Sequence, residues 1–249
     1  MKTITLIWAA LAAALALHPV TAAEMSARQR LQQADGYRGP ADDMQLDVRV
    51  VAQTKDGGEP KERRYTVFVQ AGHKSLVLMQ NPAERGQKVL MLGDDYWIIM
   101  PGSTRPMRIT PMQKLLGEVA AGDISNLRWS EDYSAAEAGE ESIDGAPAVR
   151  LTLQANRKGV TYQRIELWVG KERSQPLKAD FYVQSDKLAK SAAFVLDDPA
   201  KPTRVTAMAL TDALGNNRET RVFYSGQKPR TVPQAWLNPM FLANNPELE

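Results

Sequence analysis

Few residues of this chain have the chemistry of a catalytic acid or base. The sequence contains no cysteine and two histidines, and His73 is the only histidine beyond the N-terminal apolar run. It lies in Ala71-Gly72-His73-Lys74, a segment typical of a turn between strands, and no nucleophile-elbow sequence accompanies it. We therefore interpret His73 as a solvated loop histidine and not as the base of a Ser-His-Asp triad.

Metal binding and carboxylate catalysis are no better supported. One histidine and no cysteine leave only carboxylates as ligands, and no EF-hand loop is present. Adjacent carboxylates occur at Asp42-Asp43, Asp94-Asp95, Glu140-Glu141 and Asp197-Asp198. A glycosidase needs two carboxyl groups facing each other across a cleft, whereas neighbours on a strand point to opposite faces. Because each pair borders a predicted turn, we predict no enzyme activity, no metal site and no cofactor.

The N-terminus has the pattern of a secretory signal peptide. Lys2 is followed by an apolar run from Ile4 to Leu17 and by the small residues Thr21-Ala22-Ala23. This pattern predicts residues 1–23 as a signal peptide cleaved near Ala23. Without a cysteine at that site, the mature protein cannot be acylated there as a bacterial lipoprotein is. We therefore expect a free periplasmic protein.

Charge and hydropathy exclude two further classes of protein. The formal net charge is +2, and charges of both signs are interspersed along the chain, which does not favour nucleic-acid binding. No other apolar run approaches the roughly 20 residues of a membrane-spanning helix. Partners are therefore expected to be met through shape and apolar surface.

The positions that must carry any site follow a period of two over most of the chain. Residues 24–37 form an amphipathic helical pattern ended by Gly36 and Gly39-Pro40. Apolar residues then alternate with polar ones in many short strands separated by turns. Lys88–Leu92 and Tyr96–Met100, joined by Gly93-Asp94-Asp95, form one predicted hairpin. The pattern predicts a mainly β protein with a single domain over residues 24–249.

Four segments have a less regular pattern. Pro111 predicts the start of a short helix over Met112–Ala121, and Arg128–Tyr133 is consistent with a further strand. The small, acidic segment Ala135–Glu141 is read as a poor helix or a mobile connection. The tail from Val232 to Phe241 is expected to pack as a short irregular or helical segment.

The segment from Leu90 to Leu116 is unusually apolar. Its Tyr96–Met100 run is apolar on both faces, so it must be covered on both sides or must line a cavity. Methionines are flexible and polarizable and suit surfaces that accept varied apolar ligands. Ordinary core packing explains the same run, and periodicity alone does not decide between the two.

This segment also resembles the outer membrane lipoprotein-sorting family, the LolA-like periplasmic proteins. The resemblance is carried by three blocks: Glu84-Arg85-Gly86 with Leu90-Met91-Leu92-Gly93-Asp94-Asp95-Tyr96-Trp97, Met100-Pro101-Gly102-Ser103-Thr104-Arg105-Pro106, and Arg108-Ile109-Thr110-Pro111-Met112-Gln113-Lys114-Leu115-Leu116-Gly117 with Gly122-Asp123-Ile124. It implies an incomplete antiparallel β-barrel with a few short helices covering its open side.

The resemblance also implies a function and a set of site residues. The expected function is a periplasmic carrier that binds lipid or lipoprotein acyl chains in an apolar cavity, for transfer towards the outer membrane, with the helices as a movable lid. Expected cavity residues are Trp97, Ile99, Met107, Met112 and Leu116, and Arg105 and Arg108 are expected to contact a headgroup or a partner. The alternative is an accessory or sensor module docking on an inner-membrane transporter of the resistance-nodulation-division (RND) type or on an envelope signalling protein.

Overall fold

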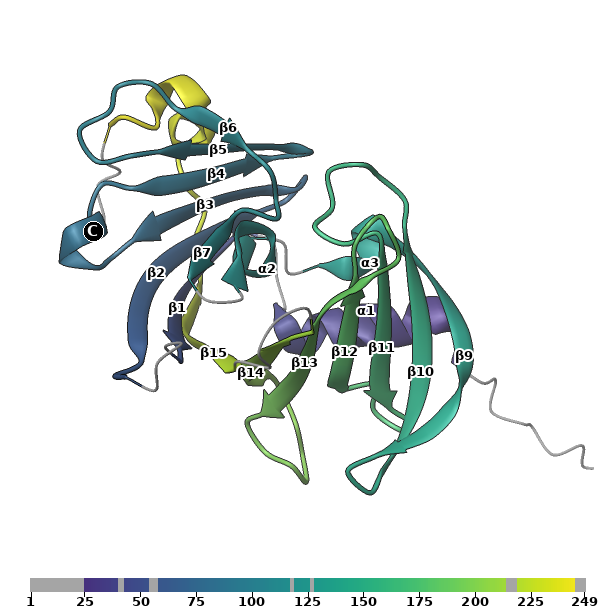
Figure 1. The fold of residues 1–249 in the computed structure, drawn as a ribbon. Coiled ribbons are helices and arrows are strands. Elements are labelled where there is room, and N and C mark those ends of the chain that lie inside the picture. Colours follow the sequence, from purple (N-terminus) through teal and green to yellow (C-terminus); the bar gives the residue numbers. More distant parts are fainter. Residues whose placement is uncertain are drawn as a thin grey trace, which may run out of the picture.

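The computed structural model describes residues 25–39, 43–53, 58–116, 119–125, 128–213 and 219–244, so the predicted signal peptide lies outside the described residues. Within these ranges, thirteen strands form one antiparallel sheet in the order β6-β5-β4-β3-β2-β1-β15-β14-β13-β12-β11-β10-β9 (Figure 1). The strands are β1 (Met44–Ala52), β2 (Lys61–Gln70), β3 (Lys74–Met79), β4 (Lys88–Leu92), β5 (Asp95–Ile99), β6 (Met107–Ile109), β9 (Tyr133–Ile143), β10 (Ala146–Ala155), β11 (Arg164–Gly170), β12 (Pro176–Tyr182), β13 (Leu188–Leu196), β14 (Val205–Asp212) and β15 (Glu219–Pro229).

The other elements are short and lie against this sheet. The described helices are α1 (Ala27–Arg38), α2 (Ala121–Ser125) and α3 (Trp129–Asp132), with 3-10 helices η1 (Pro82–Glu84), η2 (Gln234–Leu237) and η3 (Pro239–Phe241). A small hairpin consists of β7 (Lys114–Leu116) and β8 (Val119–Ala120).

The sheet curves but does not close. Its two edge strands, β6 and β9, each pair on one side only, and Figure 1 shows α1 crossing the strands from β9 to β13. An open, curved antiparallel sheet with helices on one side confirms the predicted incomplete barrel.

Helix α1 begins where the sequence predicts a helix. Ser26 is its N-cap and forms a capping box with Gln29, in which each side chain bonds the backbone of the other residue. This satisfies N–H groups that the first turn would otherwise leave unpaired. Leu31 and Ala34 are fully buried on its sheet-facing side. The predicted N-terminal helix is confirmed.

One face of the sheet, the inner face, packs against the helices. Cross-strand partners such as Val67 and Val77, or Leu151 and Leu167, point to this face together and are fully buried. Directly opposed residues in an antiparallel pair share a face, so these rows form one apolar cluster. Leu31 of α1 and Ile124 of α2 belong to the same cluster.

The opposite, outer face carries a second apolar cluster on β2 to β5. Phe68, Leu76, Leu90 and Ile99 are buried there under the C-terminal tail, which contributes Val232, Leu237 and Leu242. Both faces of β5 from Tyr96 to Ile99 are therefore covered, one by the inner cluster and one by the tail, whereas Met100 is exposed. The tail forms two 3-10 helices, as the expectation of a short helical segment allowed.

Three local predictions are wrong. Met112–Ala121 is not a helix: Leu115, Val119 and Ala120 are buried in β7 and β8, and the helix begins only at Ala121. Burial of Leu115 and Val119 against the inner cluster replaces the helix that Pro111 predicted, which illustrates tertiary packing overriding local preference.

The other two errors exchange helix and strand. Arg128–Tyr133 was expected as a strand, but Trp129–Asp132 forms α3. Ala135–Glu141, expected as a poor helix or mobile connection, lies in the edge strand β9, which pairs with β10 along its length. The segment has no period of two because an edge strand exposes most of its side chains, and backbone pairing supplies its order.

Candidate functional site

Aromatic side chains pack together on the enclosed side of the curved sheet. Trp129 of α3 packs on Phe181, with ring centroids 5.9 Å apart, and Tyr162 lies 4.6 Å from the same ring. A space of about 20 Å³ lies between these rings and the side chains of Arg38 and Met208. At this place the inner face is therefore covered by the protein's own side chains.

A buried charged group lies inside this otherwise apolar cluster. The Asp123 carboxylate accepts hydrogen bonds from Tyr162 Oη at 2.7 Å and from Lys190 Nζ at 2.8 Å. Both charged side chains are about 95% buried, with exposures of 5% and 4%. Since a buried charge is tolerated only when it is paired, this ion pair fixes α2 to β13.

Asp35 holds α1 against α3. Its carboxylate accepts hydrogen bonds from the backbone N–H groups of Trp129, at 3.0 Å, and Ser130, at 2.7 Å. It also forms an ion pair with Arg38 at 3.4 Å, and the Arg38 guanidinium lies 3.4 Å from the centre of the Trp129 ring. Burial raises the pKa of Asp35 above its ordinary value and lowers the pKa of Arg38. We call these contacts the Asp35 junction.

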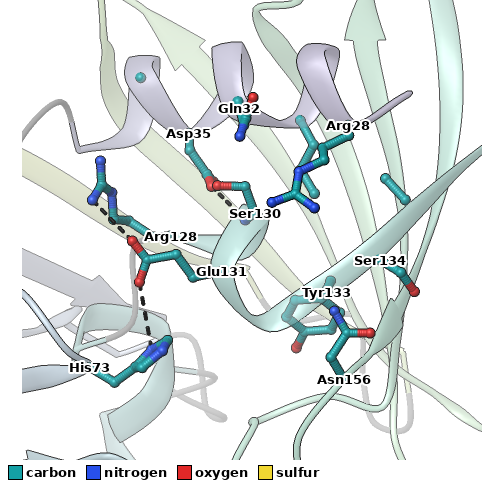
Figure 2. A pocket seen from close by; sticks show the side chains of 13 residues that line it. Arg28, Gln32, Asp35, His73, Arg128, Ser130, Glu131, Tyr133, Ser134 and Asn156 are labelled. Atoms are coloured by element: carbon teal, nitrogen blue, oxygen red, sulfur yellow. Dashed lines mark hydrogen bonds and ion pairs between the residues drawn. The ribbon is translucent and has the colours of Figure 1, made fainter. Parts of the chain in front are cut away.

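A pocket of about 840 Å³ opens next to this junction (Figure 2). Its walls are α1, α3, the start of β9 and two turns of the sheet. We call it the mouth pocket; it is lined by Arg28, Leu31, Gln32, Asp35, Gly36, His73, Arg128, Ser130, Glu131, Tyr133, Ser134, Ala135 and Asn156. Tyr133 also lines the small interior space. The mouth pocket and the small space on the enclosed side of the sheet therefore share Tyr133 as a wall.

A charged cluster crosses the open side of the barrel. Arg157, after β10, donates from Nε to Asp132 Oδ1 at 2.6 Å and from Nη1 to Asp94 in the β4–β5 turn. The same turn approaches Gly159 so closely that a Cβ there would lie 2.4 Å from the Asp94 Cα. These contacts join the β10–β11 turn to the β4–β5 turn, which are far apart in the sheet.

His73 belongs to this cluster. It lies in a turn, as expected, with a φ of +56°. Its Nδ1 is 3.3 Å from Asp132 Oδ1 and 3.8 Å from Glu131 Oε2, and its side chain is 29% exposed. The expected turn position is confirmed, but the His73 side chain is only partly solvated, because the α3 carboxylates pack against the turn.

The expected cavity residues lie on both faces of the sheet. Trp97 and Ile99 belong to the outer cluster under the tail, whereas Met112 packs on the inner cluster. Met107 is paired with Ile98, an inner-face residue, but its side chain is 55% exposed. The Leu116 side chain lies outside the described residues.

The structure thus does not bring the four residues with described side chains together on one face of the sheet. Alternation along β5 explains why: Tyr96 and Ile98 point inward, so Trp97 and Ile99 must point outward. The correct inward residues of this strand are their neighbours, Tyr96 and Ile98.

The two expected arginines lie at the β6 edge, on a different part of the sheet from the mouth pocket. Arg105 is exposed in the turn before β6. Arg108 is 68% exposed, forms an ion pair with Asp95 at 3.0 Å, and lies 5.3 Å from the Trp97 ring centre. Neither residue lines the mouth pocket.

Sequence reasoning did not identify the Asp35 junction or the mouth pocket. Asp35 reads as one more polar residue of an amphipathic helix, and its partner helix α3 was expected to be a strand. Arg28 and Gln32 are polar residues within the predicted helix over residues 24–37. Their spacing of four residues places them on one helix face, which was the available signal.

No group of three or more metal-binding side chains occurs among the described residues. None of the described helices has the length and hydropathy needed to span a membrane.

The fold and site define a class: an open antiparallel half-barrel whose inner face is covered by helices. A LolA superfamily protein from Nitrosomonas europaea has this structure, with a TM-score of 0.78 and 32% identity over 86% of this chain and 97% of that one. The chain belongs to the LolA superfamily.

Further comparisons agree on the fold. A protein from Vibrio parahaemolyticus described as an outer membrane lipoprotein-sorting domain has a TM-score of 0.68 at 20% identity, covering 86% of this chain and 97% of that one. A DUF1329 family protein from Desulfovibrio piger has a TM-score of 0.67 at 22% identity, with coverages of 85% and 94%. A family model described as "Uncharacterized protein" matches residues 71–244. A search of curated proteins finds no match.

Proposed function

We propose that this protein is a periplasmic carrier that binds the acyl chains of a lipid or lipoprotein on the inner face of its sheet and transfers them towards the outer membrane. The observation that carries the proposal is the nature of the inner cover. A continuous apolar sheet face is covered by short helices, loops and the small β7–β8 hairpin, and the edge strands β6 and β9 do not pair with each other.

The proposed mechanism is an exchange of contacts. Leu31 and Ala34 of α1 bury apolar surface against the sheet in the closed form. Movement of α1 would expose that surface, and an acyl chain would cover it again, gaining about 0.8 kcal/mol per buried methylene. No covalent step is required, and the proposed activity is binding and release.

The Asp35 junction is the proposed closing contact. Helix α3 continues directly into β9, so it moves with the sheet, whereas α1 precedes β1 and reaches α3 only through side-chain contacts. The N-terminal pattern of a signal peptide and the superfamily membership support the periplasmic location. The name of the Vibrio protein, which refers to lipoprotein sorting, supports the cargo class.

The β6 edge favours a second candidate function, docking on an RND-type transporter or an envelope signalling protein. Met100, directly after β5, and Met107, in the neighbouring strand β6, are 42% and 55% exposed, and a patch of exposed apolar side chains is typical of an interaction site. Arg105 and Arg108 border them. Under this alternative, Met107→Asp would abolish a complex with the membrane protein and leave lipid binding unchanged.

The experiment for the carrier is native mass spectrometry of the protein purified from a periplasmic extract without detergent. We expect added mass that is lost on denaturation and that lipid analysis identifies as acyl-chain material. A protein that carries no lipid after purification and also binds none when lipids are added would contradict the carrier function.

A further inference from the structure

The side chains around the mouth pocket are unequally occupied by contacts within the protein. Two carboxylates, Asp35 and Glu131, line it. Asp35 accepts two backbone hydrogen bonds and pairs with Arg38, and Glu131 pairs with Arg128 at 3.1 Å. Both acidic groups are therefore engaged within the protein.

Three other polar residues of the same pocket are different. Arg28 and Gln32 extend from one face of α1, and Asn156 lies on the opposite wall after β10 (Figure 2). The side chains of these three residues have no hydrogen bond or ion pair with any residue that the structure describes. They offer a guanidinium and two amide groups to whatever enters the pocket. The unoccupied groups are thus weighted towards donors and carry a positive charge.

The floor of the pocket is apolar. Leu31, Tyr133 and Ala135 contribute to its lining, and Tyr133 separates it from the interior space. An apolar floor leading to the inner face and a donor-rich rim match a molecule with an apolar chain and a polar head. A volume of about 840 Å³ also lies in the range of pockets that hold small ligands.

From this arrangement we infer that the mouth pocket binds the anionic headgroup, a phosphate or carboxylate, of an amphiphile whose chain lies on the inner face, with Arg28 as its principal contact. The inference rests on the proposed carrier function and specifies the class of cargo. Arg28 forms charge-assisted hydrogen bonds to the headgroup oxygens, which are stronger than bonds between neutral groups. Gln32 and Asn156 donate further hydrogen bonds from the two walls.

The alternative location for a headgroup is the β6 edge. Arg108 is already paired with Asp95, and neither Arg108 nor Arg105 lines the mouth pocket. The mouth pocket combines a guanidinium that has no ion pair with any described residue, additional donors and a direct boundary with the inner cluster. It is therefore the better site for the headgroup of a chain bound on the inner face.

The test compares dodecyl phosphate with glycerol monolaurate, an uncharged amphiphile with a chain of similar length, below their micellar concentrations. Calorimetry on the full-length mature protein is expected to give tighter binding of dodecyl phosphate by about tenfold. Arg28→Gln is expected to remove that preference and to change monolaurate affinity by less than about twofold. Arg28→Lys should restore part of it, because it restores the charge without the planar guanidinium.

Arg85→Gln is the matched control. It removes the same charge from another exposed arginine, located at the end of η1 and outside the pocket. It should retain the wild-type preference. A thermal unfolding measurement on each variant shows whether it is folded. We expect Arg28→Gln to unfold at the wild-type temperature, because Arg28 has no partner among the described residues whose loss would destabilise the protein.

The contrary outcomes are separable. Equal affinity of wild type and Arg28→Gln for dodecyl phosphate would overturn this inference and leave the carrier function intact. If inorganic phosphate binds as tightly as dodecyl phosphate, the pocket is a site for a free anion and not for the headgroup of an amphiphile. That result would also overturn this inference. Failure of both amphiphiles to bind the wild type would contradict the carrier function itself.

Discussion

The inner and outer faces of the sheet are both covered, but by contacts of different kinds. The outer cover is the C-terminal tail, where Phe68 and Trp236 pack edge to face at 5.6 Å and Leu237 is buried. The remaining space beneath it is about 10 Å³. The inner cover, α1, lies beside the mouth pocket of about 840 Å³ and is held to α3 through the Asp35 junction.

This difference indicates which cover can be removed. Opening either cover exposes buried apolar side chains, such as Leu237 of the tail or Leu31 of α1, but the hydrogen bonds of Asp35 can in addition be exchanged for bonds to water. Lys88 strengthens the outer cover further, since its Nζ donates to the Leu242 carbonyl at 2.8 Å. We propose that the tail is a permanent part of the fold and that α1 is the part that moves.

The largest expected effect comes from breaking the outer cover. Leu237→Ala removes a side chain that is 5% exposed, and we expect it to lower the free energy of unfolding by about 3 kcal/mol. Amphiphile affinity, measured below the unfolding transition, should be unchanged. A variant that keeps wild-type stability but loses ligand binding would contradict the assignment of the tail as structural.

A smaller loss of stability is expected at the inner cover, and here the affinity for amphiphiles should change. Asp35→Asn removes a charge-assisted acceptor from the Asp35 junction and should cost about 2 kcal/mol in chemical denaturation. Because the closed form is weakened relative to the open one, amphiphile affinity should rise, by up to about tenfold. Asp144→Asn, the same change in an exposed turn, is the control and should alter neither quantity.

The pH dependence of stability gives the smallest effect. Burial raises the pKa of Asp35 above its ordinary value of 3.8, so the folded protein takes up this proton at a higher pH than the unfolded chain does. The free energy of unfolding that this protonation contributes is therefore fully present at pH values below the unfolded-state pKa of 3.8. It is lost as the pH rises through the folded-state pKa. The stability difference between wild type and Asp35→Asn should therefore widen as pH falls from 7 towards 4. A difference that narrows would show that Asp35 is stabilised in its charged form.

The architecture could be predicted because it follows from local patterns. Alternating residues and turn sequences such as Gly93-Asp94 specify strands and their connections, and the β4–β5 hairpin confirms this reading, with Leu92 paired to Asp95. Alternation does not specify which face is inner. Trp97 and Ile99 were assigned to the cavity for that reason, and burial by a tail more than 130 residues later places them outside.

The candidate site could not be predicted from the sequence, because it depends on contacts between residues that are far apart along the chain. The N–H groups at the start of α3 bond to Asp35, a residue 94 positions away from Trp129. Without that partner, the segment around Trp129 looks like a strand. Arg28 and Asn156 come together at the mouth pocket only because α1 crosses the sheet beside the β10–β11 turn.

The most direct test of the account is to lock α1 to α3. The sequence contains no cysteine, so Asp35→Cys combined with Ser130→Cys allows a single disulfide between two residues already in contact. The oxidised double variant should take up neither dodecyl phosphate nor glycerol monolaurate. Reduction of the same sample should restore uptake. The two single variants are the controls, and oxidant should not change their uptake. Equal uptake by the oxidised and reduced forms, with disulfide formation verified by thiol titration, would show that the inner face does not open at α1.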